Sequence, residues 1–84
     1  MFAVYILRNS LSGRYYIGST NNTDRRLPEH NRGQTRSTRQ KGEWILVYKE
    51  VYNTSIEAKY REKQIKSYKG GNAFKRLLAA VVQR

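Results

Sequence analysis

The sequence lacks cysteine, and this absence excludes two classes of structure. With no thiol among its 84 residues, the chain can form neither a disulfide framework nor a thiolate metal site. It also has no apolar run that approaches the ~20 residues of a membrane-spanning helix. The first residues, MFAVYILRNS, show neither a basic leader nor a small-residue cleavage site. We therefore expect one small domain, residues 1–84, that stays in the cytoplasm and does not bind a membrane.

Acidic residues are also scarce, and the charge balance is strongly positive. The chain has 6 Asp and Glu residues and 17 Lys and Arg residues, which gives a formal net charge of +11. Such an excess favours a polyanionic partner, because each phosphate contact releases counterions. We expect this partner to be nucleic acid. The alternative is a basic protein that is merely soluble or that associates with the ribosome.

The scarcity of carboxylates and the single histidine limit the chemistry of any active site. Two-metal nucleases need several carboxylates around paired ions, and this chain can hardly assemble them. A single Mg²⁺, held by one carboxylate, phosphate and water, is compatible with the sequence. No His or Cys spacing fits zinc, and no glycine-rich loop fits a nucleoside triphosphate. We therefore expect no small-molecule cofactor.

The first part of the chain predicts a β-hairpin. The apolar residues 2–8 read as a strand, residues 9–13 have turn chemistry, and RYYIGS, residues 14–19, reads as the return strand. By alternation, Tyr16 and Gly18 share a face of that strand. Gly18 would leave room for a phosphate beside the sheet.

A helix, a loop and a third strand are predicted next. Thr23 can cap the helix and Gly33 follows its end. Pro28 lies past the first turn, which predicts a kink or a shifted start. Residues 34–43 are polar and basic without an apolar period, so they form a loop, and residues 44–51 read as a strand.

The last third of the chain switches to helical spacing. Thr54 and Glu57 form a capping-box pattern, and Asn72 can cap a final helix after the sequence KGG. That helix has an apolar stripe formed by Phe74, Leu77, Leu78 and Val81. The predicted order of elements is β-β-α-β-α-α.

Glu62 is the acidic residue without an ordinary explanation. It falls between Ala58 and Ile65 on the helical stripe that should face the protein. A carboxylate directed inward is costly unless it is paired or holds a cation. Two roles stay open from the sequence: a cation ligand, and an ion pair with Lys66 four residues later.

The single histidine and a nearby arginine are further candidates for catalysis. His30 follows Arg26 by four residues, on the same helical face. A lone histidine on a surface helix is usually just solvated, and Arg26 could be a plain phosphate anchor. Alternatively, Arg26 could neutralise a pentacovalent phosphorane. Tyrosine is a poor base at its reference pKa near 10, but a cationic and metal-rich site could lower that pKa.

These residues together resemble a known family. The pattern AVYILRN…SGRYYIGSTNNTDRRLPEHNRG…WILVYKE…AKYREKQIK is similar to the GIY-YIG nuclease superfamily, and in particular to small stand-alone members related to excision-repair and homing-endonuclease domains. The resemblance covers nearly the whole chain. It rests on two tyrosine motifs about ten residues apart, followed by an arginine, a histidine and a late glutamate.

The resemblance implies a role for particular residues. The first motif falls on Ala3-Val4-Tyr5, which keeps only the tyrosine of Gly-Ile-Tyr, and the second falls intact on Tyr16-Ile17-Gly18. Ser19 stands where some members have a lysine, and Asn72 is the nearest candidate for a late asparagine that some members have. The implied catalytic set is Tyr5, Tyr16, Arg26 (with Arg25 as the competing arginine), His30 and Glu62.

The resemblance also implies a fold and a mechanism. The fold is an α/β (α+β) sandwich with a central three-stranded antiparallel sheet flanked by helices. The activity is hydrolysis of DNA phosphodiester bonds with one divalent cation, Mg²⁺ or Mn²⁺, held by Glu62. Tyr5 and His30 would handle the proton of the attacking water. Tyr16 would position phosphate or water, and Arg26 would offset charge in the transition state.

Two other functions remain open from the sequence. The chain could bind nucleic acid without cleaving it, or it could cleave only with a protein partner or as a homodimer. DNA is preferred over RNA on the resemblance alone, and so small a surface predicts structure-directed or weakly specific cleavage. Expected nucleic-acid contacts are Arg25, Arg36, Arg39, Lys41 and Lys69.

Overall fold

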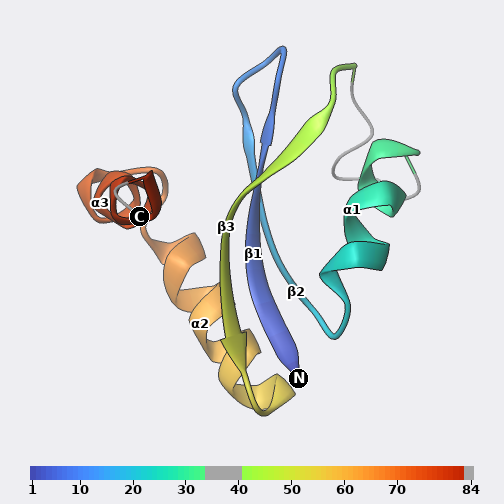
Figure 1. Ribbon diagram of the computed structural model, residues 1–84. Coiled ribbons are helices and arrows are strands. Elements are labelled where there is room, and N and C mark those ends of the chain that lie inside the picture. The colour runs from blue at the N-terminus through green and yellow to red at the C-terminus, as the bar shows by residue number, and fades with distance from the viewer. Residues whose placement is uncertain (34–40, 83–84) are drawn as a thin grey trace.

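A computed structural model of the chain describes residues 1–33 and 41–82 (Figure 1). Within these residues, three strands and three helices follow one another in the predicted order. The elements are β1 (Phe2–Asn9), β2 (Tyr15–Thr20), α1 (Thr23–Asn31), β3 (Trp44–Tyr52), α2 (Ser55–Ser67) and α3 (Asn72–Val82). The strands differ from the predicted ranges by no more than one residue at either end.

The strands form an antiparallel sheet in the order β2-β1-β3, which confirms the expected fold class. Strand β1 lies in the middle, and its residues 3–7 are all buried. This explains why β1 is apolar on both of its faces. The register places Gly18 opposite Tyr5 and Tyr16 opposite Leu7, so both motif tyrosines lie on one face of the hairpin.

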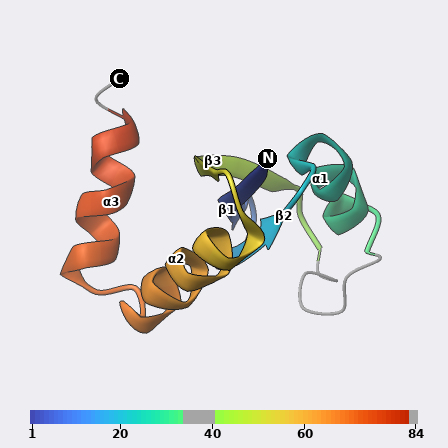
Figure 2. The same cartoon turned by 90° about the horizontal axis from the view of Figure 1, so that it is seen from below.

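The helices cover opposite faces of the sheet. Figures 1 and 2 show α1 on one side and α2 with α3 on the other. The core beneath α2 and α3 consists of Val4, Ile6, Ala58, Ile65 and Phe74. A second, smaller core on the α1 side consists of Tyr5, Leu7 and Trp44, with Tyr16 and Leu27 packed against it. Alternation along β1 therefore directs Tyr5 away from the main core.

The start of α1 differs from the prediction. Asn22, not Thr23, is the N-cap, because its side-chain oxygen accepts the backbone N–H of Arg25 at 3.1 Å. Asparagine is the stronger N-cap residue of the two, and Thr23 becomes the first helical residue. The helix continues through Pro28 to Asn31. Gly33 follows with φ +74°, a left-handed conformation that favours glycine after a helix.

The ends of the other helices are also defined by local contacts. The Thr54 hydroxyl accepts the backbone N–H of Glu57 at 3.2 Å and donates to its carboxylate at 2.9 Å, so the predicted cap of α2 is confirmed. The carbonyl of Gly71 accepts the backbone N–H of Lys75 at 3.0 Å. Gly71 therefore occupies the N-cap position of α3, and Asn72 is the first residue inside that helix rather than its cap.

No helix in the described ranges is both long and apolar enough to cross a membrane.

Candidate active site

Tyr5 and His30 form a buried hydrogen-bonded pair between the sheet and α1. The Tyr5 hydroxyl oxygen lies 2.8 Å from His30 Nε2. Only 2% of Tyr5 and 1% of His30 is exposed to solvent. The interpretation of His30 as a solvated surface residue was therefore wrong, because α1 turns this residue toward the second core.

Gly18 makes this arrangement sterically feasible. A Cβ atom at Gly18 would lie 2.8 Å from the Tyr5 hydroxyl oxygen and 2.9 Å from its Cζ, which no side chain could tolerate without displacing the ring. The phenol thus lies across the backbone of β2 where the strand has no side chain. The space beside Gly18 that the sequence suggested for a phosphate is filled by Tyr5.

Tyr16 and Arg26 complete the cluster around this pair. The ring centroid of Tyr16 lies 4.6 Å from that of His30 and 6.1 Å from that of Tyr5. The Arg26 guanidinium lies beside the Tyr5 hydroxyl and forms an ion pair with Glu29 at 2.8 Å. Arg25, the competing arginine, instead donates to Asn21 at 3.3 Å. Of the two arginines, Arg26 is the one positioned at the cluster.

The electrostatics of the cluster keep both members of the pair neutral. Burial and the positive charge of Arg26 lower the pKa of His30 to about 4. Burial raises the pKa of Tyr5 to about 12, although Arg26 opposes this rise. Arg26 alone does not lower the pKa of Tyr5, because desolvation outweighs the nearby guanidinium. At neutral pH the pair is a phenol beside an imidazole that can accept a proton.

Glu62 is held by contacts on both of its oxygens. The Ser19 hydroxyl donates to Oε1 at 2.6 Å, and the Lys66 ammonium donates to Oε2 at 2.6 Å. The ion pair with Lys66 that the sequence left open is therefore present. The Ser19 contact joins residues 43 positions apart, and no local sequence pattern indicated it. Ser19, at the position where some members of the family have lysine, instead fixes the carboxylate.

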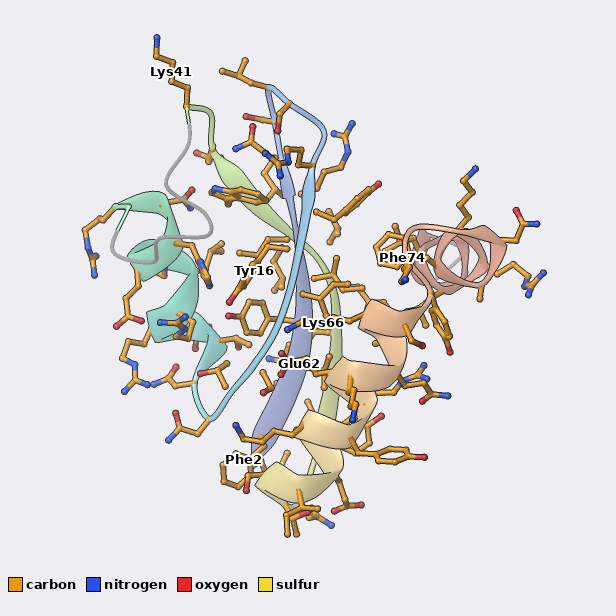
Figure 3. All side chains as sticks on the ribbon, turned by 180° about the vertical axis from the view of Figure 1, so that it is seen from behind. Phe2, Tyr16, Lys41, Glu62, Lys66 and Phe74 are labelled. Carbon is orange, nitrogen blue, oxygen red and sulfur yellow. The ribbon has the colours of Figure 1, made fainter. Side chains whose placement is uncertain are left out.

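The two halves of the site meet at the edge strand β2. Gly18 contacts Tyr5 on the α1 side, and its neighbour Ser19 contacts Glu62 on the α2 side. Figure 3 shows Tyr16, Glu62 and Lys66 in the space between α1 and α2. The aromatic cluster and the carboxylate therefore lie on opposite sides of β2, joined through the neighbouring residues Gly18 and Ser19.

Glu62 and Ser19 offer oxygen ligands that suit one hard cation. In residues 1–33 and 41–82, no group of three His, Cys, Asp or Glu side chains could hold a metal ion. Mg²⁺ commonly takes only one or two protein carboxylates and fills its other positions with water and phosphate. The donor set therefore fits a single ion once Lys66 leaves Oε2.

A contact that the sequence did not suggest fixes the end of α1 next to His30. The Asn31 side-chain oxygen accepts the backbone N–H of Trp44 at 2.7 Å, and its amide donates to the Trp44 carbonyl at 3.2 Å. These two bonds join α1 to the start of β3. They hold His30 against the sheet although residues 34–40 separate the two elements in sequence.

Several expected contacts with nucleic acid lie away from this surface. Lys41 projects at the far end of the molecule from Phe2 (Figure 3). Lys69 is exposed in a turn after α2, with φ +50°, and Asn72 is exposed at the start of α3. Arg36 and Arg39 lie outside the described residues.

Comparison with known proteins now places the chain in a family. A model of the GIY-YIG catalytic domain matches residues 1–75. The chain belongs to the GIY-YIG family. UPF0213 proteins of Staphylococcus aureus strains Mu3 and N315 are 41% identical to this GIY-YIG domain over 66 residues, which cover 77% of it and 79% of those proteins. The solution structure of UPF0213 protein BH0048 from Bacillus halodurans is 30% identical, with a TM-score of 0.55, over 96% of this chain and 85% of that one.

The family membership confirms the resemblance and points to a nuclease. A GIY-YIG catalytic domain implies binding to nucleic acid. The names of the UPF0213 relatives state no substrate.

Proposed function

We propose that this GIY-YIG domain is a metal-dependent endonuclease that hydrolyses phosphodiester bonds in DNA. The observation that carries the proposal is the buried hydrogen bond between Tyr5 and His30. This neutral pair lies across one strand from the carboxylate of Glu62. A protein that only binds nucleic acid has no need for a buried proton acceptor beside a phenol.

The Tyr5–His30 pair supplies a route for the proton of the attacking water. A water beside Tyr5 gives its proton to the phenolic oxygen as the Tyr5 proton passes to His30 Nε2. His30 is neutral at physiological pH and so offers a free lone pair, although its pKa of about 4 makes it a weak base for this step. The phenol stays neutral throughout, since a pKa of about 12 makes free phenolate costly.

The remaining residues of the site bind the substrate or the metal ion, or stabilise the transition state. Arg26 offsets the charge that develops on the phosphorane, and Tyr16, packed on His30 at 4.6 Å between ring centroids, positions the phosphate or the water. Glu62 and Ser19 would hold Mg²⁺ or Mn²⁺. Such an ion, when bound, polarises a phosphoryl oxygen as a Lewis acid.

A cleavage assay with paired variants tests the proposal. Supercoiled, branched and single-stranded DNA, and RNA of the same sequence, are incubated with Mg²⁺, with Mn²⁺ or with chelator. We expect cleavage of DNA that the chelator abolishes. Glu62→Gln and Tyr5→Phe should each lower the rate by roughly 100-fold or more. The matched controls Glu57→Gln and Tyr60→Phe change exposed residues of the same types and should retain the rate.

One observation favours a second function, a nucleic-acid-binding module that does not cleave. Both oxygens of Glu62 are engaged by Ser19 and Lys66, as they would be in a purely structural ion pair. Tight binding of every substrate without cleavage would establish this second function.

Cleavage that appears only after addition of a protein partner, or only at concentrations where the chain dimerises, would identify a nuclease that is incomplete alone. Unchanged cleavage in Glu62→Gln would remove the single-metal assignment.

A further inference from the structure

Helix α2 has an exposed row of lysines next to the candidate site. Lys59, Lys63 and Lys66 recur at intervals of four and three residues, so they lie on one side of the helix. All three are exposed. Lys66 pairs with Glu62, whereas Lys59 and Lys63 make no ion pair within the described part of the chain. We call these three residues the lysine face of α2.

The lysine face borders the carboxylate directly. Lys59 lines a cavity of about 200 Å³ together with Ser19 and Phe2, and Ser19 is the residue that holds Glu62. Lys66 contacts Glu62 from the other direction along the helix. Figure 3 shows Phe2, Glu62 and Lys66 following one another beside α2. Cations therefore flank the carboxylate on both sides along the helix.

The opposite side of α2 carries charges of both signs. There Arg61 forms an ion pair with Glu50 at 2.9 Å, and Glu57 is exposed in the first turn. The cations without a partner are thus concentrated on the side of α2 that adjoins the site. Exposed lysines are common on helices, but this asymmetry gives the helix one face that attracts a polyanion.

The length of the lysine face fits a short stretch of nucleic acid. Lys66 follows Lys59 by seven positions, which is about 10 Å along a helix with a rise of about 1.5 Å per residue. One strand of B-form DNA has a phosphate about every 3.4 Å along its axis. Because the strand winds round the axis, its phosphates lie farther apart than this rise, and the lysine face is long enough for about two successive phosphates.

We propose that the lysine face of α2 binds the phosphate backbone of the substrate strand and directs it past Glu62. This inference rests on the proposed function and adds a binding surface that the sequence did not suggest. Lys59 and Lys63 contact phosphates on either side of the scissile bond. Lys66 moves from the Glu62 carboxylate to the strand when a cation takes its place.

The test measures binding without chemistry. The affinity for a short DNA duplex is followed by fluorescence anisotropy in chelator at several KCl concentrations. A variant with Lys59→Gln and Lys63→Gln is compared with one carrying Lys75→Gln and Arg76→Gln, two exposed residues of α3 that remove the same charge. We expect the salt slope of log K to fall by about 1.8 in the first variant, about 0.9 for each lost phosphate contact, and to stay unchanged in the second.

The outcomes separate this inference from the proposed function. An unchanged slope in the α2 variant, or an equal fall in both variants, would overturn the lysine face as the binding surface. The same holds if the wild-type chain does not bind at all. The expected slopes together with no cleavage by the wild-type chain would support the binding surface and refute the proposed hydrolysis. Thermal unfolding of both variants checks that the substitutions leave the fold intact.

Discussion

His30 is a buried imidazole whose proton affinity is lowered by its surroundings. Burial lowers its pKa most, the positive charge of Arg26 lowers it further, and the Glu29 carboxylate opposes both effects. A histidine in this position stays neutral where ordinary histidines become charged. The Nε2 lone pair is therefore available at neutral pH, but the lowered pKa makes His30 a weaker base than an ordinary histidine.

Because His30 is the single histidine of the chain, its titration can be followed without ambiguity. We expect an NMR titration of its ring to give a pKa of about 4, below the usual value near 6.5. Arg26→Ala should raise this pKa by removing a nearby positive charge, and Arg25→Ala should leave it unchanged. A pKa near 6.5 in the wild-type chain would mean that the ring is solvated.

The same shift makes stability depend on pH. Between pH 6.5 and about 4 the unfolded chain binds a proton at His30 that the folded chain does not. The free energy of unfolding should therefore fall as pH falls through this window, by at most about 1.4 kcal/mol per pH unit. Urea unfolding at several pH values measures this slope. His30→Gln should reduce it, and an identical slope in both proteins would contradict the assignment.

Lys66 competes with any cation for Glu62, so its removal should strengthen metal binding. The pair is partly exposed, with 54% of the Lys66 side chain accessible, and such pairs contribute up to ~1 kcal/mol, a factor of about five. We expect Lys66→Gln to raise the affinity for Mn²⁺ by up to this factor in titration calorimetry without DNA. Lys63→Gln removes the same charge from the same helix, and an equal gain in that control would show a general charge effect.

At the scale of elements, α2 must keep its orientation for Glu62 to reach Ser19. Arg61 contributes to this orientation, because its guanidinium bonds both oxygens of Glu50 on β3, at 2.9 and 3.1 Å. Tyr48 and Tyr52 donate to the same carboxylate. Residues 61 and 62 are neighbours in sequence but attach α2 to different strands.

Removal of the Arg61 contact should therefore act on the site from a distance. We expect Arg61→Met to lower the free energy of unfolding by about 1–3 kcal/mol, since it leaves a partly buried carboxylate without its cation. Cleavage measured well below the unfolding temperature should also fall, because α2 is less firmly oriented. Glu50→Gln with Arg61→Met should recover part of the stability. A folded Arg61→Met protein with full activity would show that β3 does not position α2.

The elements themselves were largely predictable, and the contacts between them were not. Alternation and turn chemistry gave the hairpin, and capping residues gave α2. The sequence predicted that Tyr16 and Gly18 share a face of their strand. It did not predict that Gly18 lies opposite Tyr5, because the pairing register depends on the actual length of the turn. The burial of His30 depends on Asn31 contacting Trp44 across a loop. The link between Ser19 and Glu62 joins segments 43 residues apart, and periodicity carries no information about such pairs.

At the scale of the whole molecule, the net charge of +11 on 84 residues affects stability and binding in opposite directions. Like charges repel one another in the compact state, and dissolved salt screens this repulsion. We expect the free energy of unfolding to rise between low salt and about 0.2 M KCl while affinity for DNA falls. The Lys75→Gln, Arg76→Gln variant has two fewer charges and should gain less from salt. Stability that is independent of salt would show that self-repulsion is negligible.

The contact between Ser19 and Glu62 means that the candidate site is completed late during synthesis of the chain. A chain synthesised from its N-terminus contains Tyr5, Tyr16, Arg26 and His30 long before residue 62 is added. Until α2 has docked on β2, the aromatic cluster has no carboxylate across the strand. On the proposed function, a chain that ends before α2 is chemically silent. The ability to cut nucleic acid then appears only once α2 has docked on the sheet.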